Sequence, residues 1–137
     1  SVLEQNQPLI DELMTGSLNE VLVNVSQIEP STLEANPWLA KALKTMLTGS
    51  PISLNLVHLQ SQISQDLSLA ECFKLELGLS VNCCAKADFS EGVRALLIDK
   101  DRNPQWQFSD VASIPEGFAQ SLMLSPWDDG HPLKDLH

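Results

Sequence analysis

Helix start signals recur along the whole chain, and they constrain its fold more than any other feature. In a capping box, a hydroxyl and a carboxylate three residues apart satisfy the first free N–H groups of a helix. Ser17 with Glu20, and Ser68 with Glu71, are predicted to form such boxes. Asn36 and Ser50 each precede a proline, which suits the first helical position because no N–H is needed there. Together with apolar residues at helical spacing, these signals predict an all-α fold of roughly six helices.

The segment 50–63 carries the one ambiguous pattern. Ile52, Leu54 and Leu56 alternate as they would in a strand, whereas Ile52, Leu56, Leu59 and Ile63 also fit one face of a helix. The Ser50–Pro51 start signal favours the helix.

The segment 68–85 predicts a buried central helix, because its apolar residues form two stripes instead of one. The first stripe consists of Leu69, Phe73, Leu77, Val81 and Cys84, and the second of Cys72, Leu75, Leu79 and Cys83. Gly78 inside this helix costs about 1 kcal/mol relative to alanine. We therefore expect another helix to cross closely at Gly78.

The stretch "DFSEGVRALLIDKDRNPQW" (88–106) predicts a short helix that enters a charged turn. Asp88 and Glu91 are interpreted as capping residues. The side predicted to be buried consists of Phe89, Val93, Leu96 and Leu97. Charges of alternating sign follow at 99–102, which is typical of a solvated turn whose ion pairs contribute about 0 to 1 kcal/mol each. Because flanking helices offer limited cover, we also expect some apolar surface of 89–98 and its neighbours to remain exposed.

Composition restricts the class of protein. With 43% hydrophobic and 19% charged residues, 137 residues suit a single globular domain. We divide it into N-terminal helices at 1–49, central helices and a turn at 50–106, and a C-terminal segment at 107–137. Eight Lys and Arg against eighteen Asp and Glu give a net charge of −10, which argues against nucleic-acid and acidic membrane partners. The start lacks an initiator Met and the pattern of a signal peptide, so a fragment or processed chain is expected.

No constellation of side chains predicts chemistry. The histidines, His58, His131 and His137, lack the spacing of a zinc site, and no cofactor motif is present. The cysteines, Cys72, Cys83 and Cys84, fall in an apolar helical pattern and are interpreted as buried free thiols. The sequence thus predicts no catalytic residue, no metal site and no cofactor.

Three stretches nevertheless resemble a known family. "SPISLNLVHLQ", "LSLAECFKLELGLSVNCC" and above all "DFSEGVRALLIDKDRNPQW" resemble the C-terminal part of the 3-hydroxyisobutyryl-CoA hydrolases, a branch of the crotonase (enoyl-CoA hydratase/isomerase) superfamily. The resemblance implies a multi-helix C-terminal module that lacks the β/α catalytic core of a crotonase-type protein. The parent would hydrolyse acyl-CoA thioesters in valine breakdown, and the isolated module would be inactive.

The resemblance also implies partners and one weak site. In many crotonases an aromatic residue and a nearby basic residue of this helix surround the adenine of CoA; the matching positions are Leu96, where Leu replaces the aromatic, and Lys100. Expected partners are the protein's own N-terminal core or a second subunit, and the acyl-CoA substrate, in bacterial cytoplasm or mitochondrial matrix. Two alternatives stay open: an enoyl-CoA hydratase/isomerase relative, and a free-standing helical module that binds a protein through uncovered apolar faces.

Overall fold

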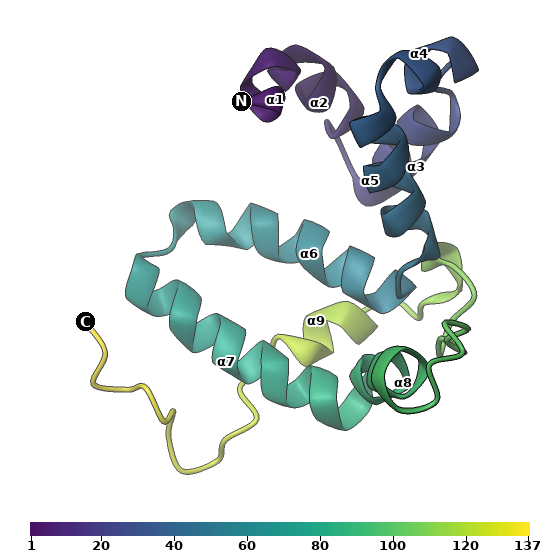
Figure 1. Cartoon of the computed structure of the whole chain (residues 1–137). Helices are drawn as coiled ribbons and strands as arrows, with labels where there is room; N and C mark the ends of the chain where they lie inside the picture. Colours follow the sequence, from purple (N-terminus) through teal and green to yellow (C-terminus); the bar gives the residue numbers. More distant parts are fainter. The chain divides into compact units, whose positions relative to one another are not determined.

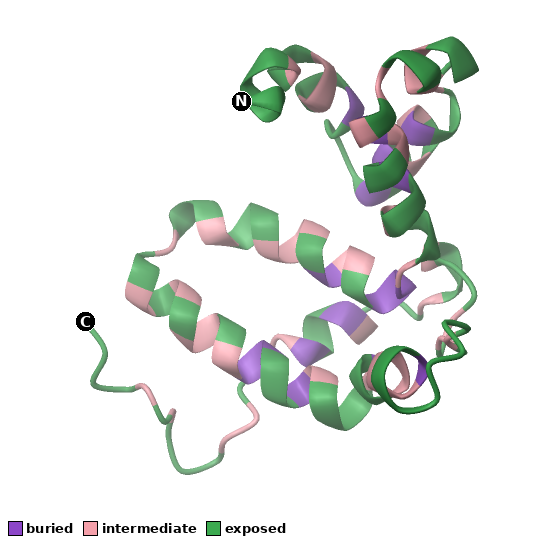
Figure 2. Ribbon diagram, viewed as in Figure 1, coloured by how far each residue is buried: buried purple, intermediate pink, exposed green.

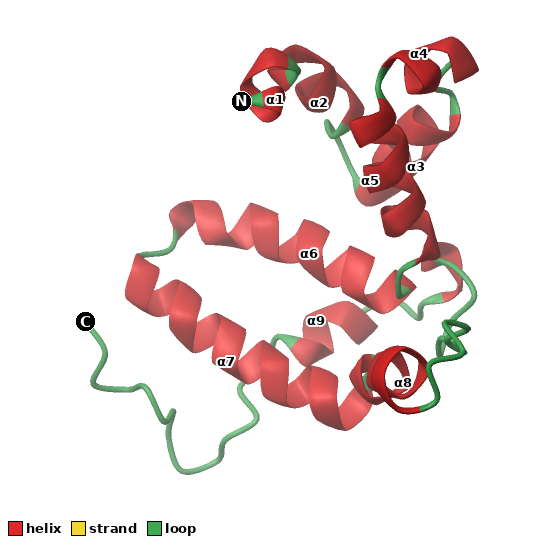
Figure 3. Ribbon diagram, in the orientation of Figure 1, coloured by secondary structure: helices red, strands yellow, loops and turns green.

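The computed structural model describes residues 1–137 and consists of helices and loops, without a strand (Figures 1 and 3). The first helices are α1 (Val2–Gln5), α2 (Gln7–Leu13), α3 (Leu18–Ser26), α4 (Pro30–Ala35) and α5 (Pro37–Thr48). Next come α6 (Pro51–Ile63), the 3-10 turn η1 (Ser64–Asp66) and α7 (Leu69–Lys86). The last are α8 (Phe89–Val93), the π-helical turn η2 (Arg94–Ile98), the 3-10 turn η3 (Val111–Ser113) and α9 (Phe118–Leu122). The all-α prediction is confirmed, and the ambiguous segment 50–63 is a helix.

The predicted capping boxes form at both sites. The Glu20 carboxylate accepts a hydrogen bond from the Ser17 backbone N–H at 2.7 Å, and the Ser17 hydroxyl accepts one from the Glu20 N–H. Ser68 and Glu71 repeat this pattern at the start of α7. Hydrogen bonds from the serine hydroxyl and backbone hold the pKa of both carboxylates below the ordinary value of glutamate. Each helix therefore begins where the sequence predicts.

The chain divides into two compact units, Ser1–Gly49 and Ser50–His137. The core of the first unit consists of Leu13, Val21, Val25, Leu39 and Leu43, from α2, α3 and α5. The core of the second unit consists of Ile52, Leu56, Leu79, Ala119 and Leu122, from α6, α7 and α9. Figure 2 shows these buried positions within each unit. The division at Gly49 coincides with the first predicted boundary; that all 137 residues act as one domain stays a prediction.

Helix α7 is not a central helix, and that prediction is wrong. Of its eighteen residues only Gly78, Leu79 and Asn82 are buried. Leu69 and Phe73, in the first predicted stripe, are 74% and 50% exposed. The reason is that α6, α9 and the segment after α9 contact one side of α7, so the first stripe is only partly covered within this chain: Leu77 is half-buried, and Leu69 and Phe73 are exposed.

The predicted orientation of the 88–98 helix is also wrong. Phe89, Leu96 and Leu97 are about 60% exposed and Val93 is half-buried, whereas Ala95 is buried. The helix widens after Val93 into the π-helical turn, where the Asp99 N–H bonds the Arg94 carbonyl five residues back at 2.8 Å. The wider turn places Ala95 on the inner side and turns the following leucines outward.

The predicted burial of the cysteines holds only in part. Cys84 is exposed, Cys72 and Cys83 are half-buried, and all three are free thiols. Partial burial, with Cys84 as its neighbour, raises the pKa of Cys83 above the ordinary thiol value. Cys84 belongs to the first apolar stripe and shares its lack of cover, whereas Cys83, in the second stripe, packs against the core of the second unit.

Candidate functional site

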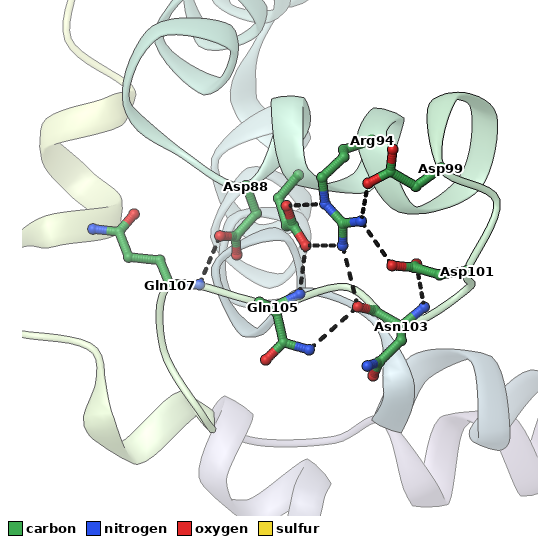
Figure 4. Close-up of polar contacts among 8 residues, drawn as sticks. Asp88, Arg94, Asp99, Asp101, Asn103, Gln105 and Gln107 are labelled. Atoms are coloured by element: carbon green, nitrogen blue, oxygen red, sulfur yellow. Dashed lines mark hydrogen bonds and ion pairs between the residues drawn. The ribbon is translucent and has the colours of Figure 1, made fainter.

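The charged segment 88–107 folds back on itself around one guanidinium group (Figure 4). Arg94 Nε and Nη2 donate to the two carboxylate oxygens of Glu91 at 2.8 and 2.6 Å. Arg94 Nη1 donates to Asp99 at 2.6 Å and to Asp101 at 2.7 Å, and Nη2 also donates to the Asn103 carbonyl at 3.3 Å. Three carboxylates and a carbonyl thus share one cation that is about one-third exposed.

Charge pairing fixes the protonation of this cluster. Hydrogen bonds from Arg94, and then from the Gln105 N–H, lower the pKa of Glu91 to about 2. Hydrogen bonds from Arg94 and the Asn103 N–H lower the pKa of Asp101, and the three carboxylates raise the pKa of Arg94. A carboxylate that titrates near pH 2 is a poor general base near neutrality. The pairing with Arg94 therefore favours the ionised form of Glu91 and Asp101, and the cluster orders the chain.

Asp88 ties the same segment to the start of α6. Its carboxylate is buried, and it accepts hydrogen bonds from the Ser50 hydroxyl at 2.6 Å and from the Gln107 N–H at 2.8 Å. Asp88 stands at the N-cap position of α8, yet its side chain makes no capping bond. The interpretation of Asp88 and Glu91 as capping side chains is therefore wrong. The Asp88 carboxylate accepts from Ser50 and Gln107, and the Glu91 carboxylate accepts from Arg94 and Gln105.

The charged turn differs from the predicted row of weak ion pairs. Asp99 and Asp101 pair with Arg94, and neither Lys100 nor Arg102 forms an ion pair. Lys100 and Arg102 instead adopt left-handed backbone conformations, with φ of 57° and 54°, which are uncommon for residues other than glycine. The chain reverses here, and the Arg102 N–H bonds the Ala95 carbonyl at 3.0 Å.

Arg94 is the residue that the sequence analysis missed. The local signal was present, since Glu91 and Arg94 stand three positions apart on a helix and so share a face. The contacts with Asp99 and Asp101 depend on the π-helical turn and the chain reversal, which residue spacing alone does not reveal.

Leu96 and Lys100 both lie exposed, Leu96 on η2 and Lys100 in the turn that follows. Leu96 belongs to an exposed group of four apolar side chains on α8 and η2. This group, called the apolar turn below, consists of Phe89, Leu96, Leu97 and Ile98. The expected exposed apolar surface on 89–98 is therefore confirmed. The contact of Leu96 and Lys100 with the adenine of CoA stays a prediction.

Groups with the chemistry of metal ligands do not converge anywhere in the structure. His58 lies beside Gln62, and His131 hydrogen-bonds the Lys74 carbonyl. A hollow of about 320 Å³ in the first unit is lined by apolar side chains and by the exposed carboxylates of Glu12 and Glu29. None of the helices is both long enough and apolar enough to span a bilayer.

Comparisons with known proteins place these elements in a family. A family model described as enoyl-CoA hydratase/isomerase matches residues 1–123. The mitochondrial 3-hydroxyisobutyryl-CoA hydrolase of Dictyostelium discoideum is 38% identical over 132 residues, which are 96% of this chain and 34% of that protein. Its counterpart from Danio rerio is 35% identical over 125 residues, 90% of this chain and 31% of that protein.

A solved structure agrees with the sequence relatives. An enoyl-CoA hydratase from Rhodobacter sphaeroides 2.4.1 matches with a TM-score of 0.80 and 29% identity, and the match covers 92% of this chain and 36% of that one. The chain thus spans about one-third of the length of the relatives it matches. The family resemblance noted in the sequence is confirmed, and the chain belongs to the enoyl-CoA hydratase/isomerase family.

Proposed function

We propose that this chain is the C-terminal helical part of an acyl-CoA thioester hydrolase of the 3-hydroxyisobutyryl-CoA hydrolase type. Its role is structural: it docks on the rest of the enzyme and carries no catalytic residue. The observation that supports this proposal is the coverage. The relatives from Danio rerio and Dictyostelium discoideum named as 3-hydroxyisobutyryl-CoA hydrolases align with 90% and 96% of this chain but with about one-third of their own length.

The chemistry of thioester hydrolysis supports a non-catalytic role for this part. Hydrolysis requires a group that activates the attack and donors that stabilise the thioester oxyanion. The strongly shifted carboxylate here, Glu91, is held ionised by Arg94 and occupied by hydrogen bonds. We infer that the reactive groups come from the remaining two-thirds of the parent enzyme.

The partner proposed for this chain is the N-terminal core of the same protein, or a second subunit. The four large apolar side chains of the apolar turn are each more than half exposed, and docking on a partner would remove them from water. The substrate class follows from the relatives' names: an acyl-CoA, with Leu96 and Lys100 as the proposed adenine contacts. A role in valine breakdown and a mitochondrial location are part of the same proposal, with bacterial cytoplasm as the alternative location.

A chimeric enzyme tests the proposal. The region of the Dictyostelium discoideum hydrolase that matches this chain is replaced by residues 1–137, and release of CoA from 3-hydroxyisobutyryl-CoA is measured. We expect activity in the chimera and none in the isolated chain or in a hydrolase that lacks the region. An inactive but folded chimera would count against the proposal and favour the free-standing helical module.

A second candidate is an enoyl-CoA hydratase, which the matched Rhodobacter sphaeroides structure favours by its description. The matching chimera with that protein is assayed for hydration of an enoyl-CoA. Activity restored there and absent from the hydrolase chimera would select this candidate.

Matched variants of the active chimera test the docking face. Leu97 in the apolar turn and Val57 on α6 are similarly exposed, at 62% and 65%. Leu97→Asp is expected to lower activity by at least about tenfold, since a charge would be buried on docking. Val57→Asp is expected to leave it unchanged. The reverse order would show that α6, and not the apolar turn, faces the partner.

A further inference from the structure

The segment that follows α9 runs antiparallel along one side of α7. It contacts α7 at three positions: Lys74, Gly78 and Asn82. These residues are four apart, so they form one stripe along the helix. Asn82 contacts residues 122 and 124, Gly78 contacts 126 and 127, and Lys74 contacts 131. The segment 125–133, called the tail below, therefore follows the stripe in order.

The residues just before the tail are fixed against α7 by Asn82. Asn82 Nδ2 donates to the carbonyls of Leu122 and Leu124, both at 2.8 Å. Asn82 is 3% exposed and Leu122 is 1% exposed. Leaving these carbonyls without a donor would be costly at a buried site, so this end is the firmest part of the contact.

The middle of the contact depends on the absence of a side chain at Gly78. A Cβ built there would lie 3.4 Å from Pro126 Cδ and 3.5 Å from the Trp127 ring. Such distances leave room for a methyl group and for nothing larger. The predicted close approach at Gly78 therefore exists, but its partner is the tail and not another helix.

The far end of the contact is held by one histidine. His131 Nε2 lies 2.9 Å from the Lys74 carbonyl, and Nδ1 accepts a hydrogen bond from the Leu133 N–H at 3.0 Å. Since Nδ1 accepts, Nε2 carries the proton and donates to the carbonyl. The His131 and Trp127 rings meet edge to face, with centroids 4.5 Å apart. Between them, Asp128, Asp129 and Gly130 are exposed.

We propose that the tail is a latch on α7. The contact of Asn82 with residues 122 and 124 stays formed when the tail detaches. The contacts that break are those of Trp127 and His131 with α7. Gly78 allows the tail to pack closely on α7, because it has no side chain. The Asn82 contact belongs to the core, whereas Trp127 and His131 make a few half-buried contacts, and segments with few buried contacts open first. The family model ends at residue 123, so the segment 125–133 itself lies beyond the part that the family model matches, whereas Gly78 and Asn82 lie within it. The proposal does not depend on which acyl-CoA reaction the parent performs.

Hydrogen exchange of the full chain, followed by mass spectrometry of its peptides, tests the latch. Trp127→Ala and Gly78→Leu are expected to speed exchange at Leu133, whose N–H bonds the His131 ring, by about tenfold, which corresponds to roughly 1.4 kcal/mol. Exchange in 51–63, on α6, is expected to stay unchanged. Ser80→Leu is the matched control, because it adds the same side chain at an exposed position of α7.

A smaller substitution sharpens the test. Gly78→Ala is expected to leave exchange in the tail unchanged, because its methyl group fits at ordinary contact distance. Tail exchange that is already as fast in the unmodified chain as in an unstructured peptide would overturn the proposal. So would equal acceleration of 125–133 and 51–63, which would indicate general loosening. If Gly78→Leu fails to fold, Trp127→Ala decides the question alone.

Discussion

Replacing Asn82 with alanine removes both hydrogen bonds that hold the end of α9 against α7. The last carbonyls of a helix have no partner within it, so Leu122 depends on a donor from outside. Asn82 supplies that donor from a position that is 3% exposed. The substitution therefore tests whether this single amide joins the two helices.

The expected loss of stability follows from these contacts. A hydrogen bond contributes about 1 kcal/mol net, and a buried carbonyl left without a donor costs about 1 to 3 kcal/mol. The Leu122 carbonyl is bonded at a buried site and the Leu124 carbonyl at a partly buried one. The higher helix propensity of alanine offsets less than about 1 kcal/mol. We expect Asn82→Ala to lower the free energy of unfolding by about 2 to 4 kcal/mol.

Asn82→Asp gives the same test a pH signature. The new carboxylate would face two carbonyl oxygens at a buried site, and both effects raise its pKa in the folded state above the ordinary value of about 3.9. Below about pH 4 the group is protonated in the folded and unfolded states alike, so the variant is least destabilised there. As pH rises towards the raised pKa, the deficit relative to the wild type should grow.

Urea unfolding of the full chain measures both variants. Trp106 and Trp127 lie in the second unit and Trp38 in the first, so a Trp38→Phe background makes fluorescence report on the second unit alone. Asn55→Ala, at a half-buried position of α6, is the control and should change stability by less than about 0.5 kcal/mol. An Asn82→Ala effect no larger than that of the control would refute the reasoning.

Three further predictions concern stability and its dependence on pH. Leu39→Ala should lower the free energy of unfolding of the first unit by about 2 to 5 kcal/mol, because Leu39 is 3% exposed. Leu47→Ala should change that free energy little, because Leu47 is 60% exposed. Urea titrations followed by far-UV circular dichroism would show which variant is the less stable. Phe89→Ala and Leu97→Ala should each shift the thermal midpoint of the isolated chain only slightly, because both are exposed; a shift equal to that of a core residue would place them inside. The pKa of Glu91 is about 2 in the folded chain, below its unfolded value, so its contribution is present above about pH 4.5 and is lost as pH falls towards 2. Glu91→Gln should remove that part of the acid dependence, and an unchanged pH profile of stability would contradict the assignment.

The helices and their starts were predictable because they depend on neighbours in sequence. A capping box needs a serine and a glutamate three residues apart, and both predicted boxes form. The Ser50–Pro51 signal likewise decided correctly between helix and strand for 50–63. Family membership was also readable, since the motif at 88–106 is specific in its residues.

The candidate site was only half predictable. The charged residues at 99–102 were visible, and so was Glu91. Their common partner was not, because Arg94 reaches Asp99 and Asp101 only after a π-helical turn and a chain reversal bring them together. Asn82 gave no signal at all, since its two acceptors lie forty or more residues further along the chain.

By itself the sequence determined the helical class, the starts of α3, α5, α6 and α7, and the family. Only the tertiary structure decided which apolar side chains are buried. Ile52 and Phe89 both follow a helix start signal, yet Ile52 is 1% exposed and Phe89 is 58% exposed. Helix formation is settled by hydrogen bonds within a few residues, whereas burial depends on which other segments pack nearby. Ile52, on α6, is buried with residues of α7 and α9, and no segment of the chain covers Phe89 to the same extent.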